Sequence, residues 1–130
     1  MTLDSPKTTV QKSASYLFHA LSDVKNFEKL MPDTIAKFEV LDENAFIFGL
    51  KGMPEIKLKM NEKTPNTKVV LGAASEKLPF ILTCNLEAVS DNETTVGLVF
   101  EGEFNTMIAM MIKSPIGKFL EALSENMVKL

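Results

Sequence analysis

Arginine is absent from this 130-residue chain, and all fourteen basic residues are lysine. Arginine side chains supply the forked hydrogen bonds that read base edges, and nucleic-acid binding needs a basic surface to meet phosphates. The chain instead carries a net charge of −3. Both features argue against a nucleic-acid partner.

Cysteine, signal sequences and long apolar runs are also scarce. The one cysteine, Cys84, cannot form a disulfide within the chain, which fits a reducing compartment. Met1 to Pro6 shows neither the basic start nor the apolar run of a signal peptide. No segment approaches the roughly 18 uncharged apolar residues of a membrane span. We therefore expect a cytoplasmic protein with no membrane-spanning segment.

The only histidine and the only cysteine are the two candidates for polar chemistry. His19 falls on the polar face of a predicted helix, beside Ser15 and Ser22, so exposure to solvent explains it better than a role as general base. Cys84 falls on the apolar face of a predicted strand without a cationic neighbour, which favours a small buried hydrophobe over a reactive thiol. No histidine or cysteine cluster matches a zinc site. We expect no metal and no cofactor.

Two short helices are predicted near the N-terminus, after a first strand at Lys7 to Lys12. Ser13 is a good N-cap for a helix that runs to about Leu21, and Asp23 can cap a second helix, Val24 to Leu30. Pro32 stops the second helix, because it disfavours helical geometry at Met31.

Most of the remaining chain alternates apolar and polar residues with the period of a β-strand. Short turn signals separate these segments. The pattern predicts about six antiparallel strands in a sheet with one face exposed to solvent. Ala36, Ala88, Gly102 and Phe104 also fall on the apolar side of the pattern. The principal inward positions are Phe38, Val40, Phe46, Phe48, Ile56, Leu58, Met60, Val69, Leu71, Phe80, Leu82, Cys84, Leu86, Val96, Leu98 and Phe100.

The chain ends in a long amphipathic helix, roughly Asn105 to Leu130. Pro115 lies inside it and should kink or locally break it near Met111 to Ser114. A twisted sheet with one apolar face must cover that face, and this helix is the only element large enough. The fold class is therefore α+β, in one domain over residues 1–130.

Two segments carry a resemblance to a known superfamily. Ser15 to Pro32, with its Leu-Ser-Asp stop and Asn-Phe stretch, is similar to the first helix pair of the START and birch-pollen-allergen superfamily, and Phe119 to Leu123 is similar to its last helix. The resemblance implies the helix-grip fold, a curved antiparallel sheet of six to seven strands around the long C-terminal helix. The superfamily also contains polyketide cyclases and dehydratases, lipid-transfer domains and coenzyme-Q-binding proteins.

The resemblance also implies a ligand pocket between the sheet and the last helix. Its mouth would lie near Met107, Met110 and Met111, with Met53 in the facing loop, although these methionines would equally serve as core filler. The candidate pocket lining is Phe38, Phe48, Met53, Ile56, Leu58, Leu71, Phe80, Leu82, Leu98, Phe100, Met107 and Met111.

Inward phenylalanines and methionines leave little room for a wide cavity. Pockets start near roughly 300 Å³, and an empty one that size would cost on the order of 7 kcal/mol, which rivals the stability of a domain. We therefore expect a small or collapsible pocket.

The predicted interior holds no acid or base, and general acid-base catalysis needs one within reach of the substrate. Glu101 and Glu103 share one face of a strand as a candidate carboxylate pair, but Lys57 and Lys59 on another strand favour a charged outer ladder. The leading hypothesis is non-catalytic binding of a lipid, isoprenoid or polyketide-like ligand. The alternatives are a cyclase or dehydratase and a protein-interaction module, with a monomer or weak dimer left open.

Overall fold

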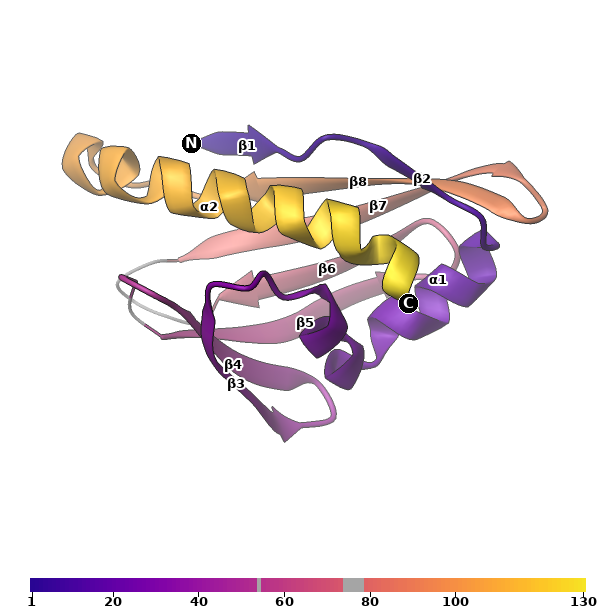
Figure 1. The fold of residues 1–130 in the computed structure, drawn as a ribbon, viewed down its shortest axis with the longest axis horizontal. Helices are drawn as coiled ribbons and strands as arrows, with labels where there is room; N and C mark the ends of the chain where they lie inside the picture. Colours follow the sequence, from indigo (N-terminus) through magenta and orange to yellow (C-terminus); the bar gives the residue numbers. More distant parts are fainter. Residues whose placement is uncertain (54, 74–78) are drawn as a thin grey trace.

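Eight antiparallel strands form one sheet that curves around a long helix (Figure 1). The computed structural model describes residues 1–53, 55–73 and 79–130. The strand order is β1-β8-β7-β6-β5-β4-β3, and β2 also pairs with β8. The strands are β1 (Thr2–Asp4), β2 (Thr8–Val10), β3 (Ile35–Asp42), β4 (Ala45–Leu50), β5 (Ile56–Thr64), β6 (Lys68–Ala73), β7 (Phe80–Ser90) and β8 (Glu93–Glu101). The predicted α+β helix-grip architecture is confirmed.

The two predicted N-terminal helices form with the predicted caps. In α1 (Ala14–Ser22), the Ser13 hydroxyl accepts a hydrogen bond from the backbone N–H of Tyr16. In the 3-10 helix η1 (Val24–Leu30), the Asp23 carboxylate accepts one from the backbone N–H of Lys25. Each cap satisfies an amide that has no partner within its helix. The apolar sides of both helices are buried in the core.

The C-terminal helix α2 (Thr106–Asn126) crosses the concave face of the sheet and is followed by a short 3-10 helix, η2 (Met127–Lys129) (Figure 1). The predicted break at Pro115 is wrong, because α2 runs unbroken through that residue. Proline removes one backbone donor, and burial of the flanking Ile112 and Ile116 outweighs that loss. Within the described ranges no helix has the length and apolarity to cross a membrane.

The strand expected at residues 7–12 forms as β2, and the sequence missed a second short strand, β1, before it. The two strands pair with different parts of β8. Between them, the backbone N–H of Ser5 donates to the carbonyl of Leu98, and the Ser5 hydroxyl accepts from the backbone N–H of Leu98. Long-range pairing with β8 creates these strands, and three-residue segments carry too little periodicity to reveal it.

Some strand positions expected to face inward are exposed. Val40 is 36% exposed and Ala36 is exposed, because β3 is an edge strand with register shifts at both ends of its pairing to β4. Ala88 is exposed where β7 extends beyond the helices that cover the sheet. Phe104 is half-buried in the connection to α2, since β8 ends at Glu101.

Aromatic contacts join the sheet to the helices that cover it. The rings of Phe48 (β4) and Phe119 (α2) stack with centroids 4.8 Å apart and an angle of 4° between their planes. Phe46 lies beside Phe48 and stacks on Phe27 of η1 at 5.2 Å and on Phe38 of β3 at the same distance. One continuous aromatic cluster thus links α2, the sheet and η1.

Side-chain hydrogen bonds fix the position of α2. The Ser124 hydroxyl, 1% exposed, donates to the carbonyl of Pro6 at 2.7 Å and lies 2.5 Å from the Thr8 hydroxyl. The Asn126 amide donates to the carbonyl of Leu30 at 3.0 Å. These bonds tie the last turns of α2 to the N-terminal strands on one side and to η1 on the other.

Replacing Ser124 by alanine should destabilise the protein by about 1–3 kcal/mol, because a buried carbonyl and a hydroxyl both lose their partner. Urea unfolding followed by circular dichroism measures this change. Ser114→Ala, on the exposed side of the same helix, is the matched control and should stay within about 0.5 kcal/mol of wild type. Equal effects of the two substitutions would contradict the assigned role of Ser124.

Candidate ligand-binding site

The space between the sheet and α2 is lined by apolar side chains. Ten of the twelve residues predicted to line a pocket belong to this core or pack against it. Phe38 and Met53 are half-buried, and the others are fully buried: Phe48, Ile56, Leu58, Leu71, Phe80, Leu82, Leu98 and Phe100. The structure brings these ten residues into one contiguous core.

Aromatic rings occupy both ends of that core. The Phe48–Phe119 stack and its neighbours lie toward η1, and a second cluster joins Phe80, Phe100 and Phe104, with centroids 4.6 Å and 6.1 Å apart. Phe104 folds back over Gly102, where an added Cβ would lie 2.6 Å from the Phe104 ring. Only glycine allows that approach, so Gly102 lets Phe104 close over the end of the sheet.

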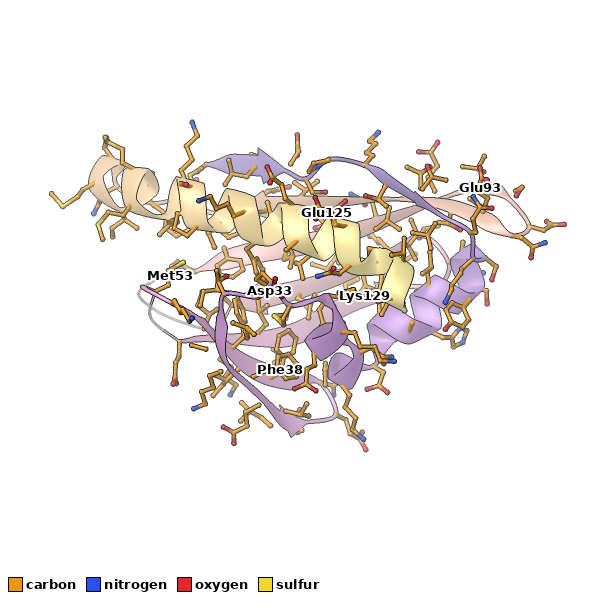
Figure 2. All side chains as sticks on the ribbon, viewed as in Figure 1. Asp33, Phe38, Met53, Glu93, Glu125 and Lys129 are labelled. Atoms are coloured by element: carbon orange, nitrogen blue, oxygen red, sulfur yellow. The ribbon has the colours of Figure 1, made fainter. Side chains whose placement is uncertain are left out.

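The remaining two predicted residues, Met107 and Met111, are placed differently. They are 72% and 69% exposed, and Met110 is 75% exposed, on the first turns of α2. Figure 1 shows these turns projecting past the ends of the strands. Met53 lies toward the same end of the molecule in the matching view of Figure 2. Their role as pocket lining remains a prediction.

Polar chemistry is scarce inside. Among the described residues, the buried polar side chains outside the apolar set are Thr94 and Ser124, both hydrogen-bonded to backbone carbonyls. Cys84 is fully buried, and desolvation raises the pKa of its thiol to about 12. Burial therefore keeps it neutral, as the interpretation of Cys84 as a small hydrophobe requires.

His19 lies on the outside of α1, as predicted. Its Nδ1 lies 2.8 Å from the carbonyl oxygen of Ser15, one turn back in the same helix, and its ring meets Phe18 edge-on. The described part of the chain gathers no group of three or more histidine, cysteine or acidic side chains able to hold a metal. His19 is thus remote from the apolar interior.

A hollow of ≈ 490 Å³ opens on the outer face of the sheet, away from α2. Lys59, Glu101 and Glu103 line it together with Gly72 and Ile81. The predicted outer placement of the charged residues is therefore correct, but sequence reasoning did not identify Gly72 and Ile81 as members of a common surface. The alternation of apolar and polar residues in β7 does place Ile81 on the outer face. A large apolar residue at an outward position was the sequence feature that could have indicated this surface.

Comparison with known proteins supports the fold and leaves the activity open. No family model matches the sequence, and no curated protein matches it. Solved structures do match: a START superfamily protein from Mycobacterium smegmatis has a TM-score of 0.74 at 13% identity, covering 98% of this chain and 94% of that chain.

Two further structures show the same fold. Norcoclaurine synthase from Thalictrum flavum, in complex with dopamine and hydroxybenzaldehyde, has a TM-score of 0.74 at 11% identity, covering 99% of this chain and 84% of that one. A Thermobifida fusca protein has a TM-score of 0.69 at 17% identity, covering 99% and 94%. The chain has the START-like helix-grip fold, and some proteins with this fold are enzymes.

The Cys84 thiol should resist alkylation in the folded protein. Burial hinders access, and a pKa of about 12 leaves almost no thiolate near pH 8. Mass spectrometry after iodoacetamide treatment should show an unmodified native protein and complete modification in denaturant. Fast native labelling would contradict the burial of this thiol.

The raised pKa also predicts a pH dependence of stability. Between pH 9.0 and about 12 the unfolded chain loses the thiol proton while the folded chain keeps it, so the free energy of unfolding should fall as pH rises through this range. Cys84→Ala removes this contribution and leaves the lysines in place. Urea unfolding should therefore show that the wild type loses more stability than Cys84→Ala over the same pH range. If the free energy of unfolding fell equally with pH in both proteins, the raised pKa of the thiol would be contradicted.

Proposed function

We propose that this protein binds a small apolar ligand, such as a lipid, an isoprenoid or a polyketide-like ring, between the sheet and α2. The observation that carries the proposal is the apolar interior between the two layers, in which Thr94 and Ser124 are the buried polar side chains of the described residues. The ligand would enter at the end where the first turns of α2 project beyond the strands, with Met107 and Met111 at the entrance.

The arrangement of residues at that end supports an entrance there. Met53, Phe104 and Ile108 are half-buried apolar residues that pack against the core without being fully covered. Met111 lies one turn from Ile108, so an exposed, adaptable side chain adjoins the partly covered surface. A ligand at this position would cover apolar surface that otherwise faces water.

We propose that binding is non-catalytic. Among the described residues, the only titratable side chain that a substrate in this interior would meet is a thiol that burial keeps neutral. The fold alone does not decide this point, since norcoclaurine synthase shares it. A free buried thiol also fits the reducing cytoplasm, which we propose as the location. The whole chain, 1–130, would act as one binding domain.

Native mass spectrometry and organic extraction of the purified protein should recover an apolar molecule, or a compound from an apolar library should raise the melting temperature by mass action. Met111→Gln should weaken binding of that compound by on the order of tenfold, since about 1.4 kcal/mol is a plausible share of one buried methionine side chain. Glutamine keeps the length and helix propensity of methionine.

Met110→Gln is the matched control, because Met110 is equally exposed but lines a hollow on the outer side of α2 with Lys113 and Gly117. It should leave affinity unchanged. Protein that is always ligand-free and never stabilised by any library compound would overturn the proposal. Equal losses in both variants would overturn the location of the entrance.

A further inference from the structure

The outer face of the sheet carries one row of side chains in which charge changes sign from end to end. Backbone pairing places Glu101 (β8) beside Ile81 (β7), Ile81 beside Gly72 (β6), and Gly72 beside Lys59 (β5). From β8 to β5, the row therefore consists of an acidic residue, a large apolar residue, a glycine and a basic residue. Adjacent strands lie about 4.8 Å apart, so it spans about 14 Å.

The middle of the row pairs an exposed apolar residue with a glycine. Ile81 is 45% exposed, although it is a large apolar residue on an open sheet face. Gly72 has no side chain, and the Asn61 amide lies over it, 2.2 Å from where a Cβ would stand. Both residues line the ≈ 490 Å³ hollow on this face. An exposed apolar side chain and a glycine covered by the Asn61 amide therefore lie side by side on neighbouring strands.

Each end of the row carries a second charge of the same sign. Lys57 lies two residues before Lys59 on β5, and Glu103 lines the same hollow as Glu101. The ion pairs in the described part of the chain join Lys37 to Glu39 and Glu55, and Lys68 to Glu62. Among the described residues, no opposite charge lies within 4.0 Å of the four charged side chains at the ends of the row, Lys57, Lys59, Glu101 and Glu103.

We propose that this face binds a second copy of the same chain through a two-fold axis that runs parallel to the strands, between β7 and β6. Such an axis reverses the row. Glu101 of each copy then faces Lys59 of the other, and Ile81 of each copy packs on the Asn61 amide that covers Gly72 of the other. A two-fold interface is self-complementary and makes every contact twice. The reversal of charge along the row is the pattern that this symmetry requires.

The next row is compatible with the same axis. Backbone pairing aligns Val99, Thr83, Val70 and Glu62 across the same four strands. The axis places Thr83 against Val70 of the second copy and Val99 against Glu62. Glu62 is already paired with Lys68 at 3.0 Å in its own chain, so it brings no unpaired charge.

The size of the patch predicts a weak dimer. Four strands and two rows cover an area of about 15 by 14 Å, or ~200 Å² on each copy. That is well below the roughly 1,200 Å² of total buried surface at which stable interfaces begin. The contact should therefore be reversible, and its charge pairs should make it stronger at low salt.

Sedimentation velocity over a series of protein concentrations tests the proposal. At about 0.05 M salt the wild type should sediment faster as its concentration rises, and less so at about 0.5 M salt. The double variants Lys57→Glu/Lys59→Glu and Glu101→Lys/Glu103→Lys should each stay monomeric, because like charges then meet at both ends of the row. An equimolar mixture of the two should associate again, because opposite charges face each other at both ends.

Two controls separate this interface from general charge effects and from misfolding. Lys113→Glu/Lys118→Glu, on α2, changes the net charge as much as the β5 variant and should leave dimerisation intact. Ile81→Asp should abolish it, whereas Val89→Asp, at the far end of the same strand and 57% exposed, should not. Circular dichroism confirms that each variant is folded. Any one of three results would overturn the proposal. The wild type could stay monomeric under all conditions, the mixture of charge variants could fail to associate, or Ile81→Asp and Val89→Asp could have equal effects.

Discussion

The packing of α2 against the concave face of the sheet is the interaction on which the rest of the structure depends. A one-sided apolar sheet is unstable in water until that side is covered, and among the helices of the described residues α2 alone is long enough to cover it. The Phe48–Phe119 stack lies in this contact, and Phe46 extends it to η1. The hydrogen bonds of Ser124 and Asn126 then fix the N-terminal strands and η1 against the same helix.

This packing also determines where chemistry can occur. The interior is apolar and well filled, so the acids and bases of the described chain lie outside it and a neutral thiol lies inside. Norcoclaurine synthase shows that the same fold can support catalysis. The fold provides a space between sheet and helix, whereas the side chains that face that space decide between binding and reaction. In the described part of this chain those side chains are mainly apolar, and non-catalytic binding is what we propose for them.

The surface divides into two parts with different properties. The end at which α2 projects past the strands exposes methionines, which adapt to apolar shapes of many kinds. The outer face of the sheet instead combines fixed charges with one exposed isoleucine, at positions set by strand register. We propose an apolar ligand for the first surface and a partner with complementary charge for the second. Because they lie on different parts of the molecule, one need not interfere with the other.

Much of the fold could be read from the sequence because its signals are local. Ser13 and Asp23 cap their helices as predicted, Pro32 ends the second one, and strict alternation identified most of the buried positions of β4 to β8, although it missed Ala45 and Thr94. The errors share a physical cause. β1 exists through pairing with β8, Val40 is exposed because β3 has only one neighbour, and α2 continues through Pro115 because flanking residues are buried against the sheet.

The sequence by itself determined the α+β class, the order of the helices and central strands, and the apolar interior without acids or bases, since periodicity and capping are properties of neighbouring residues. The tertiary structure decided which apolar residues are covered. It left the methionines at the start of α2 in water and buried Cys84 completely. Strand register decided that Glu101, Ile81, Gly72 and Lys59 form one row. These residues are far apart in the chain, and only the pairing of four strands brings them together.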